Sequence, residues 1–235
     1  MTALVGLGMI LMVVFVAAVV VGLVMLQQRL LAKHQAQMLA WTQAAGWQYT
    51  PQMPELAQRW RGTPFVGGRS AKARDVITGT TPGGREFVSF QYEYVVSTGK
   101  SSSTVYHWII AVRLPAVLPE LALNAESFAT KLVEVFGGQD IKLESEDFNK
   151  AYRVQSPDQA AAYGVLHPRM MEWLLGEGRA LTPWRITAGD LVAYRYGKPA
   201  YEYLLPRLNL LDALVDQIPR YLWSDYARGA LPGPH

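Results

Sequence analysis

The sequence predicts an α+β protein: one N-terminal transmembrane helix, followed by an antiparallel β-sheet domain packed with amphipathic helices. Three observations support this prediction. An uncharged apolar run extends from Ala3 to Leu26, apolar residues alternate along 86–96 and 104–114, and apolar residues at helical spacing follow one another from Leu204 to Leu222. Half of the 235 residues are hydrophobic, which is enough to fill a sizeable core.

The first element is a membrane anchor over residues 1–26. A helix over Ala3–Leu26 would be about 36 Å long, whereas the hydrocarbon core of a bilayer is about 30 Å thick. No basic residue precedes this run and no Ala-x-Ala site follows it, so the pattern of a cleavable signal peptide is missing. We expect a retained single span that contacts the lipid bilayer.

The charge that follows the span predicts its orientation. From Gln27 to Arg85 the chain has eight basic residues and two acidic ones. Basic residues stay preferentially on the cytoplasmic side of a membrane. We therefore expect a plasma-membrane protein with its N-terminus outside and its domain in the cytoplasm. Ala18 and Gly22 have the spacing of small residues that lets two helices approach closely, which is a weak indication of homodimerisation.

The rest of the chain divides into three parts. Residues 27–46 are predicted to form a juxtamembrane helical stalk that ends at Gly46. Residues 47–228 are predicted to form one α+β globular domain, and residues 229–235 a disordered tail. Gly67 to Arg74 is predicted to be a solvent-exposed basic loop.

Within the domain, periodicity predicts the strands and helices. Segments 86–96 and 104–114 should form an antiparallel hairpin, because apolar and polar residues alternate along both. Ser156 is a candidate cap for the next helix, and Pro219 should interrupt the C-terminal helix, whose Asp212 and Asp216 are expected on the outside. The other predicted elements are strand pairs at 141–144 with 152–155 (joined by a turn at 147–150) and at 184–187 with 191–196, and helices at 126–136, 157–166 and 168–175.

No pattern typical of an active site is present. The chain has four histidines and no cysteine, and no two histidines have metal-ligand spacing. Nucleotide-binding loops are missing, and the basic residues do not alternate with aromatic ones as in nucleic-acid-binding proteins. We expect no enzyme activity, cofactor, metal or nucleic acid. An unrecognised hydrolase would need His107 or His167 within hydrogen-bond reach of a serine and a carboxylate.

The sequence therefore favours a non-catalytic interaction or accessory module for a membrane or envelope assembly, with a membrane protein as partner. The candidate interaction surface lies in the basic juxtamembrane segment and comprises Trp60, Arg61, Arg69, Lys72 and Arg74. An alternative is a lipid-binding or amphiphile-binding domain. It would use an aromatic face of the two long strands, formed by Tyr92, Tyr94, Tyr106 and Trp108.

Two resemblances agree with a membrane-anchored module. The block Glu144-Ser145-x-x-Phe148-Asn149-x-x-Tyr152 resembles a bacterial single-pass membrane-protein family known only as a domain of unknown function. The order of span, stalk with Trp41, Gly46 and Trp47, and α+β domain is similar to the trehalose-monomycolate transport factors. That second resemblance implies a cytoplasm-facing accessory subunit of an envelope transporter. Neither family supplies a catalytic residue.

Overall fold

The computed structural model describes residues 2–97, 99, 101–126 and 139–227, with the side chains of residues 2–11, 13 and 139 left aside. The helix expected within 126–136 and the tail expected at 229–235 lie outside the described residues, apart from Glu126. Contacts divide the chain into two compact units, Met1–Gly46 and Trp47–His235. Each unit is described separately below.

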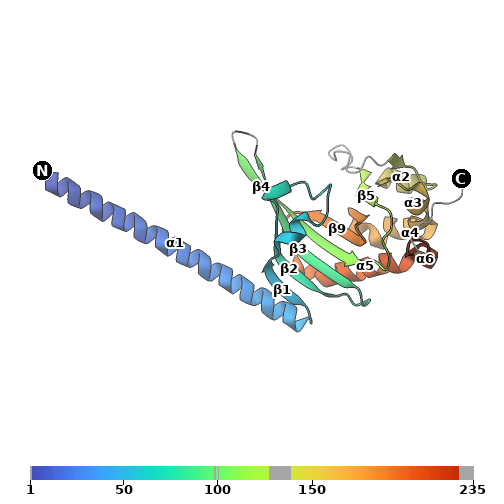
Figure 1. The fold of residues 1–235 in the computed structure, drawn as a ribbon, viewed down its shortest axis with the longest axis horizontal. Coiled ribbons are helices and arrows are strands. Elements are labelled where there is room, and N and C mark those ends of the chain that lie inside the picture. Colours follow the sequence, from blue (N-terminus) through green and yellow to red (C-terminus); the bar gives the residue numbers. More distant parts are fainter. Residues whose placement is uncertain (1, 98, 100, 127–138, 228–235) are drawn as a thin grey trace. The chain divides into compact units, whose positions relative to one another are not determined.

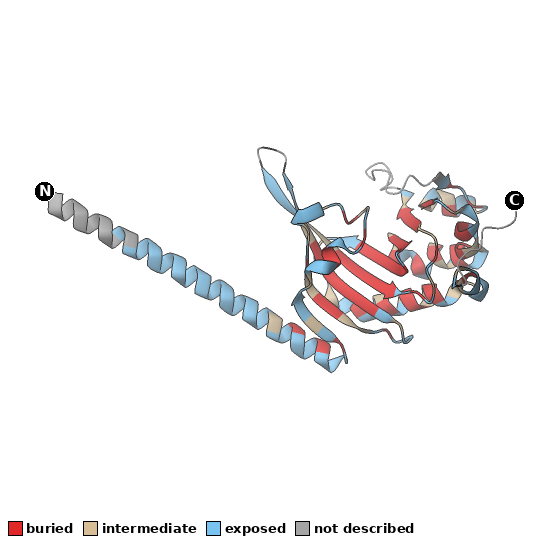
Figure 2. Ribbon diagram, viewed as in Figure 1, coloured by how far each residue is buried: buried red, intermediate tan, exposed pale blue. Residues whose placement is uncertain are grey.

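The first unit is one continuous helix, α1 (Thr2–Ala44). Its stretch Val14–Ala44 is long enough and apolar enough to span a membrane. Valine and leucine side chains along it are exposed, as the pale blue ribbon in Figure 2 shows. The length and composition of this helix are compatible with a membrane span, because in water it would expose a large apolar surface.

The second unit is built on a nine-stranded sheet in the order β1-β2-β3-β4-β9-β8-β5-β7-β6, and every neighbouring pair is antiparallel. The α+β class predicted from the sequence is therefore confirmed (Figure 1). The strands are β1 (Gln48–Gln52), β2 (Lys72–Thr80), β3 (Glu86–Ser97), β4 (Ser102–Arg113), β5 (Leu121–Ala125), β6 (Gln139–Ile141), β7 (Tyr152–Ser156), β8 (Trp184–Thr187) and β9 (Asp190–Tyr196).

Five further α-helices and several short 3-10 turns complete the described chain. They are η1 (Pro54–Gln58), η2 (Gly68–Ser70), α2 (Glu146–Ala151), α3 (Gln159–Val165), α4 (Pro168–Leu175), η4 (Glu177–Leu181), η5 (Tyr201–Tyr203), α5 (Leu204–Gln217) and α6 (Arg220–Ala227). The predicted break at Pro219 is confirmed, since α5 ends at Gln217 and α6 begins at Arg220.

The predicted β3–β4 hairpin is confirmed, and its pairing runs without interruption from Phe87↔Val112 to Ser97↔Ser102. This hairpin projects beyond the rest of the sheet (Figure 1). Alternation places neighbouring residues of each strand on opposite faces of the sheet. Phe90 and Tyr92 therefore lie on one face, whereas Trp108 lies on the other.

Both faces of the sheet are covered in its central part. On one face Tyr152 donates a hydrogen bond to the carbonyl oxygen of Leu174 in α4 at 2.7 Å, and Arg207 of α5 lies over the Trp108 ring at 5.2 Å. On the other face a covering segment, residues 53–71, places Trp60 against Phe90 with their ring centroids 6.1 Å apart. Figure 2 shows the buried residues concentrated on the strands between these layers.

Three local predictions need correction. Residues 147–150 form part of helix α2 rather than a turn, because Ser145 caps this helix by accepting a hydrogen bond from the Phe148 amide. The cap of α3 is Asp158 rather than Ser156, since the Asp158 carboxylate accepts from the Ala161 amide at 2.9 Å. The basic stretch 67–74 is not one loop, because its last three residues enter strand β2.

Candidate functional site

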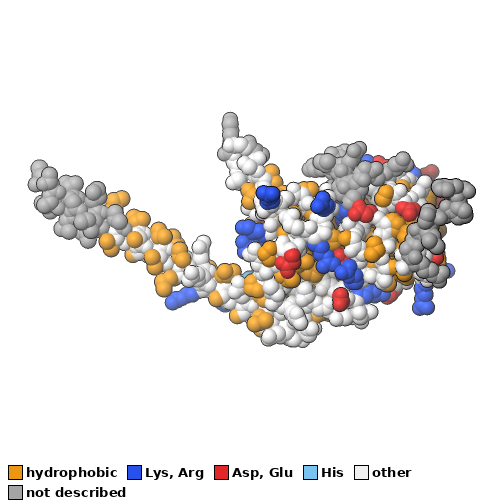
Figure 3. All heavy atoms as spheres, viewed as in Figure 1, with side chains coloured by type: hydrophobic (Ala, Val, Ile, Leu, Met, Phe, Trp, Pro, Cys, Tyr) orange, Lys and Arg blue, Asp and Glu red, His pale blue; other side chains and the backbone are white. Residues whose placement is uncertain are grey.

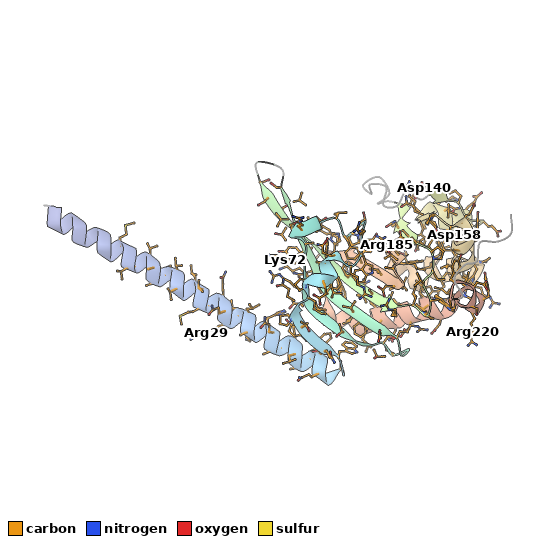
Figure 4. All side chains as sticks on the ribbon, viewed as in Figure 1. Arg29, Lys72, Asp140, Asp158, Arg185 and Arg220 are labelled. Atoms are coloured by element: carbon orange, nitrogen blue, oxygen red, sulfur yellow. The ribbon has the colours of Figure 1, made fainter. Side chains whose placement is uncertain are left out.

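The residues predicted to form an interaction surface have different environments in the structure. Arg61, Arg69 and Lys72 are exposed. Trp60 is only 3% exposed and belongs to the core of the covering segment. Arg74 is half-buried and forms an ion pair with Glu93 on the neighbouring strand, at 2.6 Å. Lys72 is labelled in Figure 4. Three of the five side chains are thus available to a partner.

Trp60 is buried because its indole has a polar partner inside the domain. Its Nε1 donates a hydrogen bond to Oδ2 of Asp190 at 3.1 Å. Arg59 donates to the same oxygen at 2.8 Å, and Arg113 lies 3.4 Å from the other carboxylate oxygen. Asp190 is 2% exposed. A buried carboxylate needs such partners, so this cluster attaches the covering segment to the β8–β9 hairpin.

A second attachment comes from Arg185 on β8. Its Nη1 donates to the carbonyl oxygens of Arg61 and Thr63, both at 2.8 Å. Burial lowers the pKa of this guanidinium to about 10, so it remains charged at neutral pH. Arg185 is labelled within the sheet domain in Figure 4. Together with Asp190, it fixes the backbone that carries the exposed Arg61.

Apolar residues accompany the exposed basic ones. Val66 is 60% exposed, and Val95 and Val96 are exposed on the projecting end of β3. The amide of Gly67 donates to the Tyr92 hydroxyl at 3.1 Å, which holds Val66 beside that strand. The basic patch, defined as Arg61, Val66, Arg69, Lys72 and Val95, therefore combines positive charge with exposed apolar surface. Figure 3 shows basic and hydrophobic side chains close together at the base of the hairpin.

The aromatic face expected for amphiphile binding is not an open surface. Tyr92 and Trp108 are both buried and lie on opposite faces of the sheet. The covering segment packs on Tyr92, with Phe65 at 5.2 Å between ring centroids. Trp108 packs against Tyr201 on the other face, at 6.3 Å. Tyr92 and Trp108 therefore belong to the packing on two opposite faces, whereas Tyr94 and Tyr106 are half-buried.

A cleft of about 700 Å³ opens at one edge of the sheet domain. It is called the edge cleft below. Its walls come from β4, the ends of β5 and β9, the loop before β8, and α5. The lining residues are Thr63, His107, Asn124, Ala125, Ala180, Thr182, Pro183, Tyr194, Arg195, Tyr196 and Arg207. No sequence motif indicated this cleft, because its residues come from six separated parts of the chain.

The histidines do not form a hydrolase site within the described residues. His167 accepts a hydrogen bond from the Met170 amide, and its Nε2 lies 3.0 Å from the Gln217 carbonyl oxygen. Nδ1 of His107 is buried and has no hydrogen-bond partner among the described residues. No group of three or more metal-ligand side chains occurs in the described part of the chain. This geometry offers no nucleophile–base pair to support the hydrolase alternative.

These features define a class of protein: an α+β domain with a nine-stranded antiparallel sheet, preceded by a single long apolar helix. A solved structure with a similar fold is the crystal structure of the mycobacterial trehalose monomycolate transport factor A. The two folds match with a TM-score of 0.55 at 14% sequence identity, over 79% of this chain and 96% of that one. At such a low sequence identity, the similarity is evidence for a shared fold alone. No protein-family model and no curated protein sequence matches the chain.

The comparison bears on the two resemblances seen in the sequence. The architectural similarity to the trehalose-monomycolate transport factors is supported at the level of the fold. The similarity to the family with the Glu144-Ser145-x-x-Phe148 block receives no support from a family model. In the structure this block forms the cap and first turn of α2 and leads to Tyr152, whose hydroxyl bonds to α4. Its residues have structural roles.

Proposed function

We propose that the protein is a non-catalytic accessory module, anchored in the plasma membrane by one helix, whose cytoplasmic domain binds a membrane protein of an envelope assembly. The observation that carries the proposal is the combination of an exposed apolar helix with a domain that has the fold of a transport factor. That neighbour's name connects it with trehalose monomycolate transport. A subunit of an envelope transporter is accordingly the class of partner that we propose.

The basic patch is the surface that we assign to the partner. Its exposed side chains Arg61, Arg69 and Lys72 carry positive charge, and Val66 adds apolar area that water solvates poorly. Charge complementarity favours an acidic cytoplasmic surface on the partner. The Asp190 and Arg185 attachments hold the backbone of this patch in place, so a partner would not have to order it on binding.

Site-specific photocrosslinking in native membranes tests this assignment. A photoreactive amino acid replaces Val66, which is 60% exposed, and in a matched control it replaces Val117, which is 66% exposed and lies in the β4–β5 loop. We expect a discrete protein adduct from position 66 only. The triple charge reversal R61E/R69E/K72E should reduce this adduct strongly. Equal labelling at both positions, or adducts with lipid alone, would contradict a protein partner at the patch.

The orientation is tested separately. The excess of basic residues after the span supports a cytoplasmic domain. A C-terminal tag should therefore be protected from protease in intact spheroplasts and digested after lysis. Digestion of the tag in intact spheroplasts would place the domain on the outside and overturn the proposed localisation.

A further inference from the structure

The edge cleft exists because strand β9 is longer than its partner β8. Their pairing runs from Thr187↔Asp190 to Trp184↔Ala193. Arg195 and Tyr196 continue β9 beyond that point and, within the described residues, pair only with β4 on their other side. Strand β5 ends nearby at Ala125. The sheet is thus open at one end, and the cleft of about 700 Å³ occupies this opening.

The size and walls of the edge cleft suit an apolar ligand. Ligand sites in proteins commonly measure about 300–1,000 Å³ and are lined mainly by apolar and aromatic groups. Here Tyr194, Tyr196, Pro183 and Ala125 line the cleft. Tyr196 is 75% exposed although it is a large aromatic residue. An apolar chain bound against it would remove this surface from water, which is favourable.

His107 contributes to the same wall as an uncharged ring. It stacks on Tyr94 with 6.1 Å between ring centroids and meets the edge of Tyr196 at 5.6 Å. Burial lowers the pKa of His107 to about 4. At neutral pH the imidazole is therefore neutral and adds no charge to this part of the cleft.

Two arginines stand together at the charged part of the cleft. Arg195 and Arg207 both line it, and Arg207 is held there by its stacking on Trp108 at 5.2 Å and by a hydrogen bond to the Ala180 carbonyl oxygen at 3.2 Å. Burial and the neighbouring charge of Arg195 lower the pKa of Arg207. Neither arginine forms an ion pair with a carboxylate among the described residues.

Two adjacent cations repel one another, and the repulsion is stronger where the surroundings exclude water. An anion placed between them would offset it and would accept charge-assisted hydrogen bonds from both guanidinium groups. Among the described residues, the remainder of the cleft offers no further lysine or arginine and is mostly apolar. A ligand that satisfies both parts needs an anionic head and an apolar body.

We propose that the edge cleft binds an anionic amphiphile. Its carboxylate or phosphate head lies at Arg195 and Arg207 on one face of the sheet, and its apolar chain passes through the opening beyond the end of β8 to Tyr194 and Tyr196 on the opposite face. This site is separate from the basic patch assigned to a protein partner, and shares no residue with it. Either a carboxylate or a phosphate head could bind at the two arginines, since guanidinium groups form hydrogen bonds and ion pairs with both.

Photolabelling of the full-length chain in phosphatidylcholine nanodiscs tests the proposal. The probe is a hexadecanoate with a photoreactive group on its chain, and adducts are located by mass spectrometry. We expect adducts within 180–183 and 194–196. Unlabelled hexadecanoate or hexadecyl phosphate should suppress them, and their relative potency identifies the preferred head. Uncharged hexadecanol and inorganic phosphate should suppress them at least tenfold less well, because each lacks one half of the required chemistry.

Variants separate a site from general adhesion of the probe. R195Q and R207Q should each weaken labelling about tenfold, the loss expected for one charge-assisted hydrogen bond. A125F should also reduce labelling by filling the cleft without changing its charge. R220Q, on the exposed face of α6 (Arg220 is labelled in Figure 4), is the control and should label normally. Circular dichroism and the thermal midpoint establish that each variant is folded.

Several outcomes would overturn the proposal. One is equal suppression by hexadecanol, which would remove the role of the arginines. Another is full suppression by inorganic phosphate, which would indicate a simple anion site. Labelling confined to residues 14–44 would show that the probe only follows the membrane helix. Loss of Val66 crosslinking, by contrast, would count against the protein-docking function and leave the result at the cleft unaffected.

Discussion

The carboxylate of Asp212 on α5 accepts a hydrogen bond from Nη1 of Arg85 at 2.8 Å. The sequence pattern placed Asp212 on the outside of its helix, yet it is only 6% exposed. Its two oxygens also accept from the Thr81 hydroxyl at 2.8 Å and from the Gly83 amide at 2.7 Å. The β2–β3 turn folds over α5 and buries this side chain, so Asp212 joins the turn to the helix.

The first prediction concerns this junction. Asp212→Asn keeps the size of the side chain but removes the charge that pairs with Arg85. We expect the variant to lose about 2–3 kcal/mol of unfolding free energy, since breaking a largely buried ion pair leaves its partner uncompensated. The thermal midpoint of the sheet domain, followed by tryptophan fluorescence, should fall by roughly 5–10 °C.

Asp216→Asn is the matched control for Asp212→Asn. Asp216 also pairs with Arg85 but its side chain is 64% exposed. An exposed ion pair contributes about 0–1 kcal/mol. If the two variants lowered the midpoint equally, the buried position of Asp212 would not be the cause.

The second prediction concerns Asp190 and the covering segment. Asp190→Asn removes the negative charge that receives Arg59 and Trp60. We expect about 2–4 kcal/mol of destabilisation, by the same argument of a broken buried pair. Hydrogen exchange should accelerate first in residues 59–67, because that part of the covering segment loses its attachment. Uniform acceleration across the sheet would contradict a local attachment. Asp225→Asn, at an exposed position on α6, serves as the control.

The third prediction follows from His107. Its pKa is about 4 in the folded protein and 6.5 in the unfolded reference. Between these values the unfolded chain binds the extra proton, so unfolding becomes easier as pH falls from about 6.5 towards about 4. The neutral His107 ring thus contributes its full share of folding stability above about pH 6.5, and progressively less as the pH falls below that value.

Replacing His107 by phenylalanine should remove this part of the pH dependence. Between about pH 7 and about pH 4.5, the unfolding free energy of the wild type should fall by about 1–3 kcal/mol more than that of the variant. This range allows for solvent screening of the partly exposed ring. Urea unfolding at the two pH values measures this difference. An identical loss in both proteins would show that His107 is not a buried neutral group.

The fourth prediction tests the anchor. Val20 and Val24 lie one helical turn apart in α1 and are both exposed. Arginine at the centre of a span costs about 2.5–3.5 kcal/mol on insertion scales. The double variant V20R/V24R should therefore move from the membrane fraction into the supernatant or be degraded. R29Q, beyond the predicted span, should remain in the membrane, and retention of V20R/V24R after carbonate extraction would argue against a spanning helix.

The sequence was most informative where a signal is local. An uncharged run indicates the long apolar helix, strict alternation indicates the β3–β4 hairpin, and Pro219 marks the end of α5. Each of these depends on the backbone and on residues a few positions apart. Short elements were less well predicted, such as α2 in place of a turn, because the Ser145 cap outweighs a weak pattern there.

The candidate sites depended on the tertiary structure for a physical reason. Periodicity indicates which residues prefer to be buried but does not identify the partners that make burial favourable. The sequence predicts Trp60 to be a surface residue of a basic segment. In the structure it is buried, because its indole N–H donates a hydrogen bond to Asp190, 130 residues away in sequence. Likewise, only the sheet order brings the open end of β9 beside β5 and α5, which creates the edge cleft. The sequence by itself determined the long apolar helix and the fold class, and long-range packing decided which side chains remain exposed.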